Sequence, residues 1–319
     1  MIRLAVDLLG ADTSEEELCR GALMALAKDD DLFLWLCGHE ETIRSQISQI
    51  PGIEDRCAIA ASPIAITNYD DPMAAYRQPE ASLVRAMQLA HREADGVITC
   101  GATGAVLVSA IMILGKLRGL RPVLAVELTN RFGNPLLLLD CGANIDSRPD
   151  LYPSFAHLGD AYMRCIGYSS PRIGLLSNGS EETKGCAAVK EAHALLKSEP
   201  IHFIGNVEAT QILQGVTDVV VCDGFHGNIL LKSIEGTAKA VIGELEELIS
   251  IRDGVEAEAL RLVRTKYDYN TQGGAVLLGV RKIVMKGHGS ATGEAVAHMV
   301  ERAATLARNR FVEKVESVC

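Results

Sequence analysis

The sequence predicts an α/β protein with a mostly parallel β-sheet that is covered by helices on both faces. Short runs of apolar residues alternate with stretches of helical periodicity along most of the 319 residues. Several of these runs end at a glycine and pass into a polar turn before the next helical pattern, as expected at the carboxyl edge of a parallel sheet. With 48% apolar and 23% charged residues, the chain has enough apolar material for an ample core, and disorder is not expected.

The expected strands follow one another with room for a helix between most of them. They lie at 2–6, 32–37, 57–61, 95–99, 123–128, 135–140, 172–176, 201–204, 218–222 and 282–286. The clearest helical patterns lie at 14–28, 80–93, 104–117, 183–197, 227–250 and 290–309. Side chains of the N-cap type precede two of them, at Thr103 and at Ser180 through Thr183. No repeat or Pro-rich linker divides the chain, so we expect a single domain over 1–319, with 236–268 as a candidate protruding helical pair.

The net charge, the cysteine pattern and the lack of long apolar runs exclude several classes of protein. The net charge of −10 and the scattered basic residues argue against a nucleic-acid groove. Nine cysteines form no C-x-x-C pair, and Cys37, Cys100, Cys141 and Cys222 lie in apolar runs, where buried free thiols are expected. The amino terminus lacks the pattern of a cleavable signal, and no apolar run approaches the ~20 residues that span a bilayer. We therefore expect a soluble protein of the reducing cytoplasm.

Three glycine-containing turns follow expected strands in the first half of the chain. D-L-L-G-A-D, from Asp7 to Asp12, fits a strand-to-helix turn capped by Asp12 about as well as it fits a functional site. T-C-G-A-T-G-A, at 99–105, precedes a helical pattern, where backbone amides can bind an anion. D-C-G-A-N-I-D, at 140–146, is more often turn chemistry than catalysis when it stands alone.

Three polar clusters of the second half indicate function more strongly. E-E-T-K-G, at 181–185, places Lys184 beside two acids, where it either binds an anionic substrate or belongs to a solvated charge cluster. D-G-F-H-G-N, at 223–228, follows a very apolar strand, and its two glycines permit close approach of the backbone to a ligand. K-G-H-G-S, at 286–290, sets His288 between glycines at a strand end; a lone histidine is usually structural, but this one is a candidate donor. A phosphate or another oxyanion suits such turns.

The order and spacing of these motifs resemble the PlsX-type phosphate acyltransferases over almost the whole chain. The matching segments are G-A-N-I-D at 142–146, E-E-T-K-G at 181–185, I-G-N-V-E-A at 204–209, V-C-D-G-F-H-G-N at 221–228, G-G-A-V-L-L-G at 273–279 and K-G-H-G-S at 286–290. The resemblance implies a three-layer α/β/α sandwich similar to isocitrate and isopropylmalate dehydrogenases and to phosphotransacetylases, and it implies a homodimer. It also implies conversion of an acyl thioester of acyl carrier protein and inorganic phosphate to an acyl phosphate, with no metal or redox cofactor.

The resemblance and the needs of this reaction together suggest site residues. Phosphorolysis of a thioester passes through a tetrahedral oxyanion, so the site needs donors aimed at that oxygen and a cradle for phosphate. The catalytic candidates are His288 and Lys286 for charge stabilisation, with Asn228 and Asp223. The candidates for binding phosphate or substrate are Ser82, Thr103, Gly104, Lys184, Gly227 and Ser290. Phosphotransacetylases carry a similar D-x-x-x-G-N motif and a late S-R-G-type turn, which Gly287-His288-Gly289 matches here.

Several loop positions depart from the family pattern. D-x-M-G-G-D reads D-L-L-G-A-D, R-x-K-x-S-S reads R-Q-P-E-A-S, and G-N-T-G-A reads G-A-T-G-A. The altered positions are Ala11, Pro79, Ala81 and Ala102, together with Ser177, Asn178 and Gln272. A retained fold with altered loops fits a divergent paralogue with another acyl donor. The family's membrane-touching helical pair is shortened to 236–268 and carries five glutamates, at 244, 246, 247, 256 and 258, which predicts weak or no membrane contact.

Two further hypotheses stay open on the sequence. One is phosphorolysis of a short acyl thioester, as in phosphotransacetylases or the PlsX-like subunit of amino-acid reductase complexes. The other is a catalytically weakened scaffold that binds an acyl carrier, because the family's lysine, serine and asparagine at three loop positions are absent. A dehydrogenase is disfavoured, since no G-x-G-x-x-G follows the first strand and no paired-aspartate metal site is evident.

Overall fold

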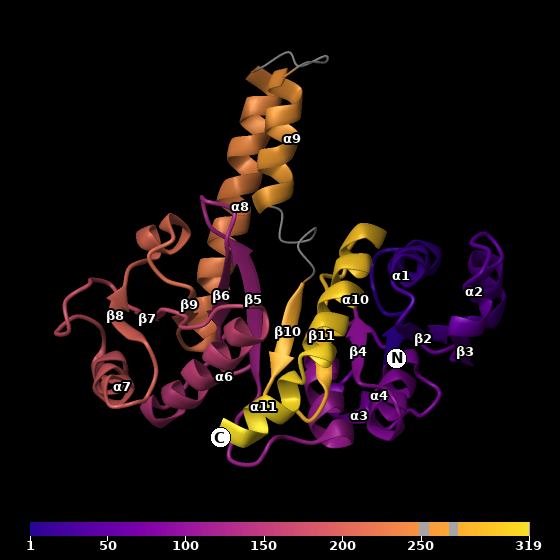
Figure 1. Ribbon diagram of the computed structural model, residues 1–319, viewed down its shortest axis with the longest axis horizontal. Helices are drawn as coiled ribbons and strands as arrows, with labels where there is room; N and C mark the ends of the chain where they lie inside the picture. Colours follow the sequence, from indigo (N-terminus) through magenta and orange to yellow (C-terminus); the bar gives the residue numbers. More distant parts are fainter. Residues whose placement is uncertain (249–254, 268–273, 319) are drawn as a thin grey trace. The chain divides into compact units, whose positions relative to one another are not determined.

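The computed structural model describes the fold of residues 1–248, 255–267 and 274–318 (Figure 1). Gln272, one of the positions that depart from the family pattern, lies outside the described residues. The chain divides into two compact units, one formed by Met1–Pro122 with Gly273–Cys319 and the other by Val123–Gln272. Parallel strand pairs predominate in each unit, as the sequence predicted.

The first unit is built on strands that run mostly in one direction. They are β1 (Ile2–Asp7), β2 (Leu32–Gly38), β3 (Cys57–Ala61), β4 (Gly96–Thr99), β10 (Ala275–Leu278) and β11 (Ile283–Lys286), in the order β3-β2-β1-β4-β11-β10. The pairs are parallel except for β10 with β11. In register, Val6 pairs with Ile98, and Thr99 pairs with Lys286. The last residues of β1, β4 and β11 therefore meet at one edge.

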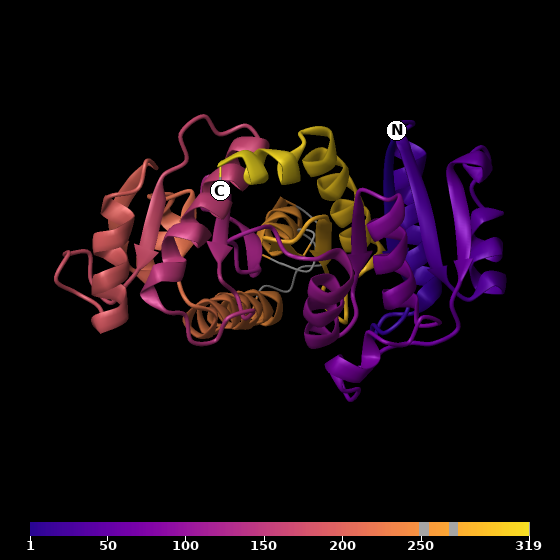
Figure 2. The same ribbon diagram turned by 90° about the horizontal axis from the view of Figure 1, so that it is seen from below.

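Helices cover both faces of these strands. They are α1 (Glu15–Lys28), α2 (Glu40–Ile47), α3 (Pro72–Ala75), α4 (Ser82–Arg92), α5 (Thr103–Ser109), α10 (Gly293–Arg308) and α11 (Phe311–Val318). Ala5, Val97 and Val284 point to the face where they form a core with α4 and α5. Among the described residues, α1 and α10 contribute nothing to that core; they pack on each other (Figures 1 and 2), and α10 packs on β1 and β4. Because side chains alternate along a strand, the two helical layers lie on opposite faces.

The second unit repeats the mostly parallel pattern. Its strands are β5 (Val123–Thr129), β6 (Pro135–Leu139), β7 (Ile173–Leu176), β8 (Phe203–Val207) and β9 (Val219–Val221), in the order β5-β6-β9-β7-β8, with β5 and β6 antiparallel. Its helices are α6 (Tyr152–Cys165), α7 (Ala187–Lys197), α8 (Gly224–Leu248) and α9 (Val255–Tyr267), with a 3₁₀ helix, η4 (Ala209–Gln214). The helices α8 and α9 contact each other and extend beyond the strands of their own unit (Figure 1).

Some elements differ from the sequence-based expectation. Strand β10 and helices α2, α3, α6 and α11 were not expected, and α7 begins at Ala187 rather than at 183. Helix α2 buries only Ile43 among its eight residues, so it carries little apolar periodicity. The helix that begins at Thr103 turns π-helical over Ala110–Leu114 and ends before 117. None of the helices in the described parts of the chain is long and apolar enough to cross a bilayer.

Candidate active site

Three buried polar residues lie in a row at the carboxyl edge of the first unit. They are Asp7, Thr99 and Lys286, the last residues of β1, β4 and β11. The Thr99 hydroxyl donates to Asp7 Oδ2 at 2.7 Å and accepts the N–H of Gly101 at 3.0 Å. The N–H of Leu9 donates to Asp7 Oδ1 at 3.3 Å. Asp7 therefore holds the beginnings of the two turns that follow β1 and β4.

The Asp7 carboxyl group is buried, and burial disfavours its charged form. Burial raises the pKa of Asp7 from its usual 3.8 to about 6, although four neighbouring groups lower it. Ser82, a predicted binding residue, is one of them: its hydroxyl is fully buried at the start of α4, close to Asp7 but outside hydrogen-bond geometry with any described residue. The ammonium group of Lys286 is another, and it also donates to the carbonyl of Gly287. The structure thus brings Ser82 and Lys286 together around a carboxylate.

The loop of His288 is tied down on both sides. The N–H of Gly287 donates to the Thr99 carbonyl at 2.8 Å, and the Gly289 carbonyl accepts the N–H of Asp12 at 2.8 Å. His288 Nδ1 accepts the N–H of Ser290 at 3.2 Å and lies 2.9 Å from the Ser290 hydroxyl. Because Nδ1 is an acceptor here, the neutral ring carries its hydrogen on Nε2. Ser290, a predicted binding residue, therefore orients the exposed imidazole.

Asp12 does not cap a helix, contrary to one reading of its turn. The N-cap of α1 is Ser14, whose hydroxyl accepts the N–H of Glu17 at 3.3 Å. A Cβ on Gly289 would lie 2.6 Å from the Asp12 carboxylate, so the two loops approach too closely for any other residue without a shift. Asp12 instead helps to join the turn after β1 to the His288 loop.

The turn after β4 leads into a helix without a side-chain cap. The cap position of α5 is Ala102, so the expectation that Thr103 supplies a capping hydroxyl was wrong by one residue. Thr103 and Gly104 are instead the exposed first residues of the helix. Among the described residues, no side chain caps the first-turn N–H groups of α5. Such an end suits a bound anion as the missing acceptor.

In the second unit, Asp140 is a structural residue. Its buried carboxylate accepts hydrogen bonds of 2.6–3.2 Å from the backbone N–H groups of Leu124, Gly142, Ala143 and Asn144, and from the Asn144 amide. Burial raises the pKa of Asp140, and the donors oppose that rise. The D-C-G-A-N segment is therefore turn chemistry, which was the favoured interpretation when it was taken alone.

The same turn supports the start of α8. The Asn144 carbonyl accepts the N–H of Gly224 at 2.7 Å, and a Cβ on Gly224 would lie 2.6 Å from that oxygen. A Cβ on Gly227 would overlap the Asp140 carbonyl. The N–H of Gly227 donates to the Asp223 carbonyl at 3.0 Å. These contacts explain both glycines of D-G-F-H-G-N by packing, and Gly227 already has an acceptor for its N–H.

Asp223 caps α8 and pairs with a histidine. Its Oδ1 accepts the N–H groups of Phe225 at 3.0 Å and His226 at 2.9 Å, and its Oδ2 lies 2.6 Å from His226 Nδ1. With the Nδ1 hydrogen directed at the carboxylate, Nε2 is the acceptor of the neutral ring. Asp223 is 14% exposed and His226 is 63% exposed, so the ring faces solvent. Asn228 is exposed on the same turn of the helix.

Lys184 lies in a loop rather than in a helix. The cap position of α7 is Cys186, without a side-chain hydrogen bond, so Ser180 through Thr183 do not cap it. Asn178, one of the departures from the family pattern, closes this loop because its Oδ1 accepts the N–H of Gly185 at 2.8 Å. Lys184 is exposed on the closed loop.

Three residues near these clusters were absent from the sequence-based set. They are Asp7, His226 and Tyr152. The pKa of Tyr152 is raised mainly by its burial and further by the nearby Asp223 carboxylate. Asp7 stood in a motif whose functional reading was left open. The sequence pattern predicted a helix that begins at 227, whereas α8 begins at Gly224. The pairing of His226 with Asp223 at the start of this helix was therefore not predicted. Tyr152 opens α6, which the sequence pattern did not reveal.

Comparison with known proteins shows the family. The family described as "Fatty acid synthesis protein" matches residues 2–314. A phosphate acyltransferase of Geobacillus thermodenitrificans is 37% identical over 326 residues, covering 99% of this chain and 98% of the relative. One of Bacillus cytotoxicus is 35% identical over 327 residues with the same coverage. The chain belongs to the PlsX family of phosphate acyltransferases.

Solved structures confirm the predicted fold class. A phosphotransacetylase from Streptococcus pyogenes superposes on this family member with a TM-score of 0.65 at 15% identity, covering 96% of this chain and 94% of the other. A 4-hydroxythreonine-4-phosphate dehydrogenase from Klebsiella pneumoniae superposes with a TM-score of 0.54 at 14% identity, covering 96% and 99%. At such low identity the likeness shows the fold alone.

Proposed function

We propose that the protein transfers an acyl group from acyl carrier protein to inorganic phosphate, and that it works as a homodimer in the cytoplasm. Family membership supports the reaction type. The observation that carries the proposal for this chain is that D-G-F-H-G-N and K-G-H-G-S, despite the altered loops nearby, each hold an exposed imidazole in a defined hydrogen bond: His226 on Asp223 and His288 on Ser290.

The reaction sets the demands on these groups. A phosphate oxygen forms a bond to the thioester carbonyl carbon, the carbonyl oxygen becomes an oxyanion, and the carbon–sulfur bond then breaks. The products are an acyl phosphate and a thiol, so the proton of the hydrogen phosphate ends on sulfur. No oxidant or reductant takes part. The site needs an oxyanion donor, an anion cradle and a group that moves one proton.

The first unit offers the donor and the cradle. His288 has its ring hydrogen on Nε2 and donates to the oxyanion, and Lys286 adds positive charge. Thr103 and Gly104, which are exposed at the start of α5, form an anion cradle that suits a phosphate, because the first turn of α5 has no side-chain cap among the described residues. The Ser82 hydroxyl is buried close to Asp7, so we assign it to that carboxylate and not to the phosphate.

The second unit contains a group that suits proton transfer. His226 Nε2 can accept and release a proton, because Asp223 orients the ring and stabilises its charged form. Lys184 and Asn228 bind anionic oxygens of the substrates. Gly227 contributes through packing, since its N–H is already bonded within the helix.

The test measures thiol release from acyl carrier protein, coenzyme A and protein-cysteine thioesters, with and without inorganic phosphate. We expect release only with phosphate, and an equal amount of acyl phosphate trapped by hydroxylamine. Release that does not need phosphate would indicate a hydrolase. Preference for short acyl groups on coenzyme A or on a protein cysteine would favour short-chain phosphorolysis. Inactivity with every donor, with carrier binding intact, would indicate a scaffold.

A further inference from the structure

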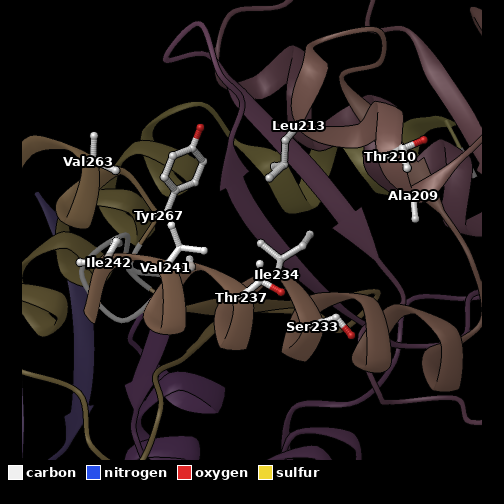
Figure 3. Close-up of a pocket in the computed structure, with 11 residues that line it drawn as sticks. Ala209, Thr210, Leu213, Ser233, Ile234, Thr237, Val241, Ile242, Val263 and Tyr267 are labelled. Atoms are coloured by element: carbon white, nitrogen blue, oxygen red, sulfur yellow. The ribbon is translucent and has the colours of Figure 1, made fainter. Parts of the chain in front are cut away.

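A pocket of about 600 Å³ lies inside the second unit, between η4, α8 and α9 (Figure 3). Leu213 of η4 points toward α8 from the opposite wall, and Val263 of α9 borders one end. Among the described residues that line the pocket, none carries a charge. Its volume falls in the range of about 300–1,000 Å³ that is typical of small-ligand sites, and its walls suit a hydrocarbon better than an anion.

The pocket shares a helix face with the Asp223–His226 pair. His226, Leu230, Ile234, Thr237 and Val241 follow one another at spacings of three and four, so they lie on one face of α8. The last three of these line the pocket. At about 1.5 Å per residue, Ser233 lies about 14 Å and Ile242 about 27 Å along the helix axis from Gly224. The pocket therefore extends along α8, away from its first turn.

We propose that this pocket binds the distal part of a long acyl chain while the thioester lies at the first turn of α8; this rests on the proposed function. An extended chain advances about 1.2 Å per bond, so about the twelfth carbon reaches Ser233 and about the sixteenth reaches Thr237. Chains of four to eight carbons end before the pocket. The pocket thus selects long acyl groups and takes no part in the reaction of short ones.

A large side chain placed at either of two depths in the pocket should set the acyl-chain length above which activity falls. Ser233→Trp blocks the near end and Thr237→Trp blocks the middle; both native side chains are exposed, so the fold should tolerate the change. Lys239→Trp, an exposed position on the opposite face of α8, is the matched control. The assay compares kcat/KM for butyryl, octanoyl, myristoyl, palmitoyl and stearoyl thioesters of acyl carrier protein, with thermal melting to confirm folding.

We expect Ser233→Trp to lower kcat/KM at least tenfold for myristoyl and longer chains and to leave butyryl within twofold. Each methylene group withdrawn from apolar contact costs about fourfold in affinity. Thr237→Trp should spare myristoyl and affect stearoyl, and Lys239→Trp should change neither. The same chain-length profile in all three variants would overturn the proposal. An equal loss at every length, with a changed molar mass in light scattering, would also overturn it and would make the pocket an interface between copies.

A binding measurement separates this proposal from the proposed function. The fluorescent fatty acid cis-parinaric acid should bind the parent protein and bind Ser233→Trp at least tenfold more weakly, whether or not any thioester reacts. If no donor supports phosphate-dependent thiol release, the proposed function fails while this result still assigns the pocket to a hydrocarbon chain. Equal binding by the parent, Ser233→Trp and Lys239→Trp would contradict the pocket itself.

Discussion

Replacing Asp7 with asparagine should stabilise the protein at neutral pH, because it removes a carboxylate charge from the interior. Asp7 is 3% exposed, and burial raises its pKa from 3.8 to about 6. The folded state therefore holds this proton more tightly than the unfolded chain does. A rise of about two pKa units corresponds to about 3 kcal/mol at pH 7, and that figure already includes the favourable interactions with Thr99 and Lys286.

The pH dependence distinguishes a charge effect from a hydrogen-bond effect. For the parent, the contribution of Asp7 to the free energy of unfolding is fully present below pH 4, is lost as the pH rises from about 4 to about 6, and is constant above that. Asp7→Asn lacks this dependence, so its stability relative to the parent should grow over the same interval.

The assay is urea unfolding of both proteins, followed by circular dichroism at pH 4, 5, 6 and 7.5. Asp12→Asn, an exposed position of the same turn, controls for the general loss of a negative charge. An Asp7→Asn protein that is less stable than the parent by the same amount at every pH would refute the reasoning. It would show that the bonds from Thr99 and Leu9 to the carboxylate outweigh the cost of its burial.

Three further outcomes are expected. His288→Ala should lower kcat about a hundredfold with an unchanged melting temperature, because it removes a preorganised donor to the oxyanion; parallel losses of activity and stability, both restored by His288→Gln, would indicate packing instead. Gly227→Ala should lower the free energy of unfolding by about 1–3 kcal/mol in urea, because its Cβ would overlap the Asp140 carbonyl; parent-like stability would show that α8 can move away. The protein should stay unbound in flotation with phosphatidylglycerol liposomes at physiological salt, since exposed Glu244 and Glu246 offset an attraction of about 1 kcal/mol per basic residue; flotation that is lost when 244–262 is replaced by a polar linker would contradict this.

The fold class and the positions of most strands could be predicted from local patterns. The run L-A-V-D at 4–7 and the run D-V-V-V-C at 218–222 each form a buried strand that ends in a polar turn, and apolar runs followed by glycine show where such strands stop. The motifs of the candidate site could also be found, because D-G-F-H-G-N and K-G-H-G-S are short and contiguous. Helix boundaries were less certain: a start at 227 instead of Gly224 concealed the i, i+3 pair of Asp223 and His226.

The sequence by itself determined the alternation of strands and helices, the family, and the segments that carry polar groups at strand ends. Only the tertiary structure decided which of these groups meet. Asp7 and Thr99 are 92 residues apart and bond at 2.7 Å because parallel strands bring their carboxyl ends to one edge. Gly227 is required because the helix packs on the carbonyl of a residue from a different strand end. Burial, pairing and close approach arise from contacts between segments that are distant in the sequence. They therefore cannot be predicted from a local pattern of residue types.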